Sequence, residues 1–302
     1  MKVVIAGGSG FLGNELVHHY ENVNCEVVVL TRGKSKLVRK INYVHWDAVS
    51  EGDWEDYLND TDVVINLTGK TINCRFTDAN KFEIINSRVN ATRILQTAIN
   101  KLDKKPSLWI NASAASIYGQ ENGDLMTEDN LERGDDFSAK VAQSWENAFF
   151  DDKSSDVRKV ALRISLILGK NGGVFPVLRK LTRFGLGGKM GNGRQNFGWV
   201  HVTDVIRLID FIIKKEEISG PVNCVSVSTP TNKEFMRSFR KALHMPFGLP
   251  QPKILLKIGS LIIGTESELI LASISAYPKR LIESGFKFKF DNAQDALNDL
   301  CE

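Results

Sequence analysis

Apolar runs alternate with helical stretches through the first half of the chain, and this alternation predicts a parallel sheet. The first run, KVVIAG at residues 2–7, is continuous and rich in β-branched residues, as are strands buried on both faces. Similar runs predict strands at 26–32, 43–47, 62–69, 107–114 and 158–169, with helices up to about residue 21, at about 78–100 and at about 136–149. The alternation predicts the α/β class, with a Rossmann-like doubly wound parallel sheet and right-handed crossovers.

The pattern changes after residue 170. Glycines cluster at 171–176 and 185–199, a strand is expected at 221–227 and a helix at 231–243, with Thr231 or Asn232 as its cap. Helical segments then continue to about residue 284, and the alternating FKFKF at 286–290 predicts a half-exposed strand. We expect this part to form a smaller, discontinuous C-terminal lobe over the ligand-binding edge of the sheet.

A glycine-rich turn joins the first strand to the first helix. AGGSGFLG at residues 6–13 contains Gly7, which allows a tight turn, and Gly10, which lets the backbone approach a pyrophosphate. Gly13 allows close packing of helix on strand, and the helix start at Phe11 and Leu12 offers N–H groups and a positive dipole to phosphates. The position of the motif in a βαβ unit predicts a dinucleotide site rather than a purely structural turn.

The end of the second strand indicates which dinucleotide binds. The stretch LTRGKSK contains no carboxylate for a ribose 2′-hydroxyl, whereas Arg32 and Thr31 can hold a 2′-phosphate, with help from Lys34. The alternative is a solvated arginine at a strand end. We therefore expect NADP(H) as the cofactor.

Residues 1–170, with return segments around 200–225, are expected to form the NADP-binding domain, and residues 171–302 the substrate lobe.

Composition and charge exclude several other classes. The 302 residues are 42% hydrophobic and 25% charged with a net charge of +3, which is typical of soluble globular proteins and gives no nucleic-acid footprint. The four cysteines are far apart and form no CxxC, which favours free thiols in a reducing cytoplasm and no metal site. No signal peptide fits, and the apolar stretch ILLKIGSLIIG is only 11 residues long, so no membrane span is expected.

Several longer motifs resemble one family. They are GGSGFLG, NLTG, KFEIINSRVNATRIL, SAASIYG, the loop GLGGKMGNGRQNFGW with VHVTDV after it, and PKRLIESGF. The chain is identified as an atypical member of the extended short-chain dehydrogenase/reductase superfamily. It is similar to the epimerase family proteins, which are related to nucleotide-sugar epimerases. The resemblance covers nearly the whole chain and includes the small C-terminal domain of that group, at about residues 248–295.

The resemblance implies an NADP(H) site assembled from several segments. Thr31 and Arg32 would hold the 2′-phosphate, and Leu67 and Thr68 would carry the backbone under the cofactor. Two residues on the following helix, Glu83 and Arg88, match positions near the cofactor. They diverge by about 140° around an ideal helix, so a solvated charged helix face is the alternative interpretation.

The resemblance also shows what this chain lacks. Extended members use a tyrosine as general acid/base and a lysine four residues later that lowers its pKa. Phe137 and Val141 stand at those positions, and Lys140 points about 100° away from the lysine position. At the end of the fifth strand, Ser113 is present although the usual serine position falls on Ala114. Ser113 and Tyr118 are the remaining side-chain candidates for a proton donor, beside water and the substrate itself. Tyr118 matches a wall residue in relatives.

Two further groups of polar residues need an interpretation. His201 and Asp204 resemble a catalytic pair, but a strand–helix junction at which Thr203 or Asp204 caps the helix explains them better. In the loop 185–199 we expect Lys189, Arg194 and Gln195 to border a substrate pocket, with Trp199 as its apolar floor. A glycine-rich surface turn is the alternative for this loop.

The sequence leaves two functions open. One is an NADP(H)-dependent oxidoreductase or epimerase-like enzyme that acts on a small polar substrate without the Tyr/Lys pair. The other is a non-catalytic NADP(H)-binding or redox-sensing module. The retained cleft and basic loop favour the enzyme, and the missing pair favours the module. Fold alone does not decide between them, because function resides in the site.

Overall fold

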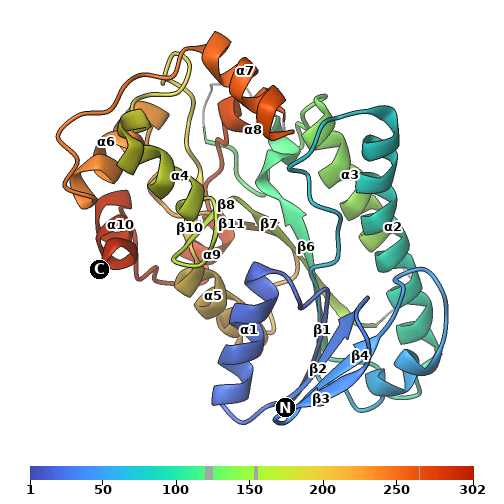
Figure 1. Cartoon of the computed structure of the whole chain (residues 1–302). Coiled ribbons are helices and arrows are strands. Elements are labelled where there is room, and N and C mark those ends of the chain that lie inside the picture. Colours follow the sequence, from blue (N-terminus) through green and yellow to red (C-terminus); the bar gives the residue numbers. More distant parts are fainter. Residues whose placement is uncertain (120–124, 153–155, 265) are drawn as a thin grey trace.

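A mostly parallel sheet of eight strands organises the molecule. The computed structural model describes residues 1–119, 125–152, 156–264 and 266–302, and Figure 1 shows their arrangement. The strand order is β11-β7-β6-β5-β1-β2-β4-β3, and only β3 runs antiparallel to its neighbour. The strands are β1 (Lys2–Ala6), β2 (Glu26–Thr31), β3 (Lys36–Val38), β4 (Ile41–His45), β5 (Val63–Asn66), β6 (Leu108–Ala114), β7 (Arg158–Ile164) and β11 (Gly220–Cys224). The predicted α/β class and Rossmann-like sheet are confirmed.

Helices cover both faces of this sheet, and each face has its own apolar core (Figure 1). One face packs against α1 (Phe11–Asn22) and α5 (Val202–Lys214), through buried residues such as Leu16 and Ile209. The other face packs against α2 (Asp78–Lys101) and α3 (Phe137–Phe150). Two short 3-10 helices, η1 (Asp53–Leu58) and η2 (Ala115–Tyr118), contact α2 and α3 respectively. Burial on both faces explains why the strands β1, β2 and β5 are continuous apolar runs.

The C-terminal lobe has a small sheet and a separate core. Its strands are β8 (Leu166–Gly169), β9 (Gly172–Gly173) and β10 (Trp199–His201), in the order β10-β8-β9. Its helical segments are α4 (Phe175–Leu181), the π-helical turn η3 (Thr182–Leu186), α6 (Asn232–Ala242), α7 (Lys253–Ile263), α8 (Ser267–Leu271) and α10 (Ala293–Cys301). The short helix α9 (Lys279–Glu283) instead packs against β11, and its Leu281 is buried in the core of the large sheet. Phe235 and Phe239 of α6 pack with Leu297 of α10 in this core.

The predicted strand at 158–169 is wrong as a single element. It divides at Ser165, whose N–H donates to Cys224 O of the large sheet at 3.1 Å. The next residue, Leu166, donates to Gly198 O at 3.3 Å and begins β8 of the small sheet. The apolar run therefore connects the two sheets. Its first half is buried in the core of the large sheet, and its second half is buried in the core of the C-terminal lobe.

The predicted strand at 286–290 is also wrong, since these residues adopt no strand. The buried carboxylate of Asp204 accepts hydrogen bonds from the N–H groups of Lys289 at 2.8 Å and Phe290 at 2.9 Å. Phe286 and Phe290 alternate with exposed lysines because their rings are buried in the two cores.

Two helix caps can be compared with their predictions. Thr231 caps α6 in a capping box with Glu234, as expected. At the start of α5 the cap is His201, whose Nδ1 accepts from the N–H of Thr203 at 3.1 Å. Neither Thr203 nor Asp204 caps this helix, so that part of the prediction is corrected.

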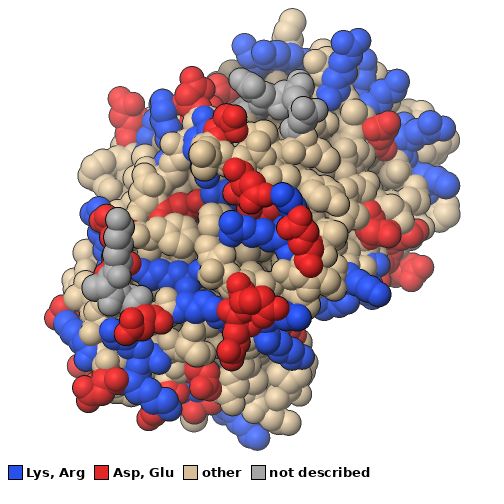
Figure 2. Space-filling model, turned by 180° about the vertical axis from the view of Figure 1, so that it is seen from behind, with Lys and Arg blue, Asp and Glu red and all other residues tan. Residues whose placement is uncertain are grey.

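The surface carries charges of both signs. Figure 2 shows lysine and arginine intermixed with aspartate and glutamate on the face seen from behind. Across the described ranges, no helix is long and apolar enough to cross a membrane. The same residues contain no group of three or more histidine, cysteine, aspartate or glutamate side chains that could hold a metal ion.

Candidate cofactor site and the buried polar network beside it

Gly7 and Gly13 of the glycine-rich turn are tightly packed. Gly7 has a φ of +74°, and a Cβ on it would lie 2.9 Å from the Cα of Thr68. A Cβ on Gly13 would lie 2.5 Å from the Cα of Gly8. Both glycines are therefore required by the protein's own packing, Gly7 for the turn and Gly13 for the contact of α1 with the turn.

Gly10 is different, because no packing contact explains it. A Cβ there would meet only Gly7 O, at 3.9 Å, and its φ of −80° is open to any residue. Gly10 stands at the N-terminus of the 12-residue α1, which has no side-chain cap. Open space, uncapped N–H groups and a helix dipole fit the pyrophosphate of a dinucleotide.

The next two residues face the protein interior. Leu12 is buried in the core, and the ring of Phe11 lies against Gly169 and Gly172, where a Cβ would overlap it. Phe11 thus ties α1 to the small sheet. Any contribution of Phe11 and Leu12 to a phosphate site would come from their backbone.

The end of β2 presents an unengaged arginine. Arg32 follows the last residue of the strand and is exposed, with no hydrogen bond or ion pair to any described residue. The Oγ1 of Thr31 accepts from Gly33 N at 3.2 Å, and its hydroxyl proton remains available to donate. This pair can receive a phosphate group without breaking an existing ion pair.

The loop after β5 lies directly against the glycine-rich turn. Leu67 N donates to Ala6 O at 2.8 Å, and Thr68 N donates to Asn66 Oδ1 at 3.0 Å. The Oγ1 of Thr68 is buried with no partner among the described residues. A buried hydroxyl without a partner is uncommon, and a ligand group at this place would satisfy it.

Glu83 and Arg88 both contact Lys70 in this loop. Glu83 pairs with the Lys70 ammonium, and the Arg88 guanidinium donates to Lys70 O at 3.0 Å and Ile84 O at 2.8 Å. Arg88 also lies 5.0 Å from the ring centre of Trp145, and burial lowers its pKa to about 10. The two residues therefore share a neighbourhood, despite their angular divergence on α2, and Arg88 supports the loop.

Apolar side chains occupy the two positions at which the family resemblance places the tyrosine and the lysine. The ring of Phe137 packs edge-on against Phe76 at 4.6 Å between centroids, and Val141 is buried. The side chain of Lys140 is exposed and makes no hydrogen bond or ion pair with the described residues. Neither Phe137 nor Val141 can transfer a proton or lower the pKa of a neighbouring phenol by charge.

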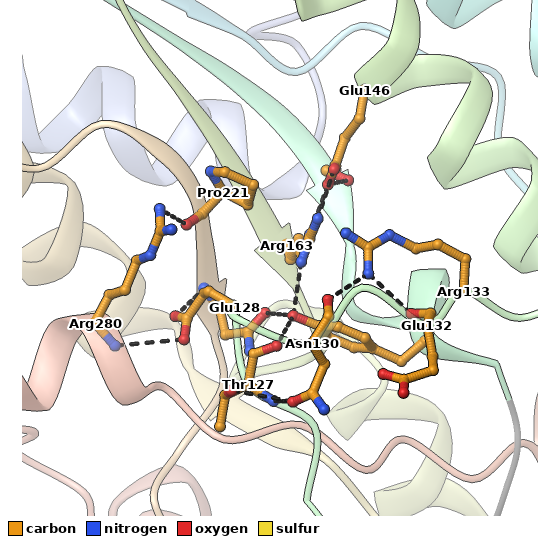
Figure 3. Close-up of polar contacts among 12 residues, drawn as sticks. Thr127, Glu128, Asn130, Glu132, Arg133, Glu146, Arg163, Pro221 and Arg280 are labelled. Carbon is orange, nitrogen blue, oxygen red and sulfur yellow. Dashed lines mark hydrogen bonds and ion pairs between the residues drawn. The ribbon is translucent and has the colours of Figure 1, made fainter.

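A buried ion pair joins Glu146 of α3 to Arg163 of β7 (Figure 3). Arg163 Nε donates to Glu146 Oε1 at 2.8 Å, and a terminal nitrogen donates to Oε2 at 2.7 Å. Ser113 Oγ donates to the same Oε1 at 2.7 Å. Ser113 on β6 and Arg163 on β7 are register partners, and Arg163 is the partner of Asn223 on β11, so the three form a row across the sheet.

Tyr118 is held at the end of this network. Its hydroxyl accepts from Arg163 at 2.7 Å and lies 2.9 Å from both Asn223 Oδ1 and Thr127 O. Burial raises the pKa of Tyr118, and the Arg163 charge opposes that shift. The structure thus brings both proton-donor candidates, Ser113 and Tyr118, into one network and engages both hydroxyls there.

Sequence reasoning missed Glu146, Arg163 and Asn223. A signal for two of them was present, since Arg163 interrupts an apolar strand and Glu146 follows Trp145 on an apolar helix face. A charge that a sheet buries usually has a paired partner. The partner itself could not be found from the sequence, because 17 residues separate the two.

The glycine-rich loop at 185–199 divides into exposed and buried parts. Lys189 and Arg194 are exposed, whereas Gln195 is buried and donates to Met190 O at 3.1 Å. Trp199 is 0% exposed and packs in the core of the C-terminal lobe. The expectation that Trp199 forms the floor of an open pocket is therefore corrected, because the lobe buries it completely.

The fold and the glycine-rich turn define the class: a dinucleotide-binding protein of the extended short-chain dehydrogenase/reductase type. Residues 3–224 match the NAD dependent epimerase/dehydratase family, and the chain belongs to it. Residues 251–300 match a domain of unknown function, DUF1731, which agrees with the expected small C-terminal domain. The chain is 35% identical over 302 residues to epimerase family protein YfhF of Bacillus subtilis, covering 99% of this chain and 98% of that protein.

Solved structures share the architecture. Human epimerase family protein SDR39U1 (isoform 2), whose structure contains NADPH, has a TM-score of 0.88 and 27% identity, and the match covers 100% of this chain and 99% of that one. A UDP-N-acetylglucosamine 4-epimerase from Bacillus cereus has a TM-score of 0.77 at 20% identity, with 100% and 98% coverage. The second likeness shows the fold alone.

Proposed function

We propose that the protein is an NADP(H)-dependent oxidoreductase or epimerase-like enzyme that acts on a small polar substrate. The observation that carries the proposal is Gly10, which leaves open space at the uncapped start of α1 where packing demands no glycine. Nearby, Thr68 Oγ1 is buried without a described partner. These features fit a bound dinucleotide better than a structural turn.

Arg32 and Thr31 support NADP(H) over NAD(H). An unengaged guanidinium after β2 can form charge-assisted hydrogen bonds with a 2′-phosphate, and no carboxylate stands there to select a 2′-hydroxyl. The human relative that was crystallised with NADPH agrees with this choice. We further propose that Gly7, Gly10 and Gly13, with the loop at Leu67 and Thr68, surround the cofactor.

A bound nicotinamide would supply hydride transfer, and the protein would have to supply the proton by another route. Phe137 and Val141 leave no general acid at the usual place. The hydroxyls of Ser113 and Tyr118 are engaged in the buried network. The proposal therefore favours water or the substrate itself as the proton source.

The second candidate is a non-catalytic NADP(H)-binding or redox-sensing module. The observation that favours it is the apolar pair Phe137 and Val141, since an enzyme of this family without its acid/base has lost a large part of its catalytic power. This candidate makes the same prediction for cofactor binding and the opposite prediction for turnover.

A turnover assay separates the two candidates. Purified protein with NADPH is supplied with fractions of cell-derived metabolites, and with a panel of nucleotide sugars, while cofactor fluorescence is followed. The oxidoreductase form of the proposal predicts saturable net consumption of NADPH with at least one fraction. The epimerase-like form returns the hydride to the product, so it predicts saturable formation of an isomer without net consumption of NADPH. Both forms predict no epimerisation of nucleotide sugars. If no fraction gives either NADPH consumption or an isomer, although the protein is saturated with NADPH, the binding module is favoured. Nucleotide-sugar epimerisation that requires a residue of α3 would show that the catalytic pair has been misplaced.

A further inference from the structure

A second arginine lies beside the buried network, in the segment that leads from Tyr118 to α3. The Arg133 guanidinium carbon is 5.7 Å from the ring centre of Tyr118, and that of Arg163 is 5.1 Å from it. Two guanidinium groups, which Figure 3 labels, therefore lie close to one phenol ring.

The backbone fixes the position of Arg133. Gly119 has a φ of +84°, and a Cβ on it would lie 2.9 Å from the Cα of Gly134. Gly134 N donates to Ile117 O at 3.0 Å, and Gln143 donates to Gly134 O at 2.6 Å. The two ends of the segment are thus in backbone contact, and Arg133 is held next to Tyr118.

Arg133 uses only part of its hydrogen-bonding capacity. One terminal nitrogen donates to Asn130 O at 2.7 Å and Glu132 O at 2.8 Å. Its Nε and other terminal nitrogen have no hydrogen-bond partner among the described residues. Since a guanidinium presents five N–H donors in a planar fork, a pair of donors remains for a ligand.

No carboxylate pairs directly with Arg133 within the described part of the chain. Arg163 is neutralised by Glu146 through two hydrogen bonds, whereas no described carboxylate lies within ion-pair distance of Arg133. Figure 3 shows the Glu132 carboxylate directed away from the guanidinium. Burial, and then the nearby Arg163 charge, lower the pKa of Arg133, while Glu146, Tyr118 and Glu132 oppose the shift only in part. An anion bound to the guanidinium would favour its charged form.

We propose that Arg133 is an anion-binding residue of the substrate pocket, and that the substrate carries a carboxylate or phosphate group. The inference rests on the proposed function, because it places the anion at the carboxyl end of β6, beside the start of α3 at Phe137. Ligands of open α/β sheets bind at the carboxyl ends of the strands. The anionic contact is thus assigned to Arg133, which lies outside the glycine-rich loop at 185–199.

The experiment follows the side-chain Nε–H signals of arginine-labelled protein by NMR, with and without NADP(H). Inorganic phosphate and acetate are titrated separately, which distinguishes the two ligand chemistries. The signal that is missing in Arg133→Gln identifies Arg133, and it should move saturably with one anion. By calorimetry, Arg133→Lys, which keeps the charge but loses the fork, should bind that anion about tenfold more weakly. The matched control Lys140→Gln removes an exposed positive charge from α3 and should bind the anion as wild type does.

The possible results separate this inference from the proposed function. An Arg133 signal that neither anion moves, or an Arg133→Gln variant that binds the anion as wild type does, overturns the inference. Thermal unfolding shows whether Arg133→Gln is folded, and Arg133→Lys gives the answer if it is not. NADPH affinity is measured in the same samples. Failure of NADPH to bind would overturn the proposed function while the response of Arg133 to anions could still be seen.

Discussion

At the scale of single residues, the glycines of the turn divide into those that packing requires and one that only a ligand explains. Gly10→Ala should change the free energy of unfolding by less than about 1 kcal/mol, because its Cβ would enter open space. It should still weaken NADPH binding at least tenfold. Gly13→Ala, the matched substitution, should destabilise by about 1–3 kcal/mol, because its Cβ would strike Gly8. Urea unfolding and cofactor titration measure both. Equal destabilisation by the two, or intact binding in Gly10→Ala, would contradict this division.

His201 gives a pH dependence with a definite sign. Burial lowers the pKa of its imidazole, with Lys289 acting in the same direction and Asp299 and Asp204 opposing it. The folded state therefore resists protonation, so stability is full above the unfolded pKa of about 6.5 and is lost as the pH falls toward the lower folded value. His201→Asn keeps a helix cap but cannot titrate. Between pH 7.5 and 5.5 the free energy of unfolding of His201→Asn should fall less than that of wild type. The difference between the two proteins should be at most about 1.4 kcal/mol per pH unit. Parallel profiles of the two proteins in urea would refute the assignment.

At the scale of elements, one contact joins the C-terminal domain to the loop after β5. Glu266, immediately before α8, accepts from Phe76 N at 2.9 Å and lies 3.4 Å from Arg75 Nε. Phe76 in turn packs on Phe137. Glu266→Ala should raise hydrogen exchange at residues 71–77 about tenfold, the scale of one charged hydrogen bond, and change global stability little. Glu268→Ala, on the exposed side of α8, is the control and should leave that exchange unchanged. Identical exchange in the two variants would mean that the contact does not order the loop.

Elements whose signal is local could be predicted from the sequence, and those set by distant contacts could not. The strands β1, β2, β5 and the glycine-rich turn carry their pattern within a few residues. The division at Ser165 depends on Cys224 and Gly198, and the end of the chain near Phe290 is ordered by Asp204. The same holds for the site. Gly10 and Arg32 were found from spacing, whereas the burial of Trp199 follows from a lobe that only the fold assembles.

At the scale of the whole molecule, a dinucleotide-binding fold is combined with apolar residues where the family resemblance places the catalytic pair. The glycine-rich turn and the loop after β5 meet at one edge of the large sheet. The start of α3 presents Phe137 and Val141, and a buried network engages the hydroxyls of Ser113 and Tyr118. The central proposal is therefore that the protein retains an NADP(H) site without the proton-transfer pair that usually serves it.

The most direct test is calorimetric titration of NADPH and NADH into wild-type protein and Arg32→Ala. We expect wild type to prefer NADPH. Arg32→Ala should lose about 1–3 kcal/mol of NADPH binding, the value of hydrogen bonds to a charged group, and should bind NADH as wild type does. Equal affinity of wild type for the two cofactors, or an Arg32→Ala variant that binds NADPH unchanged, would contradict the account.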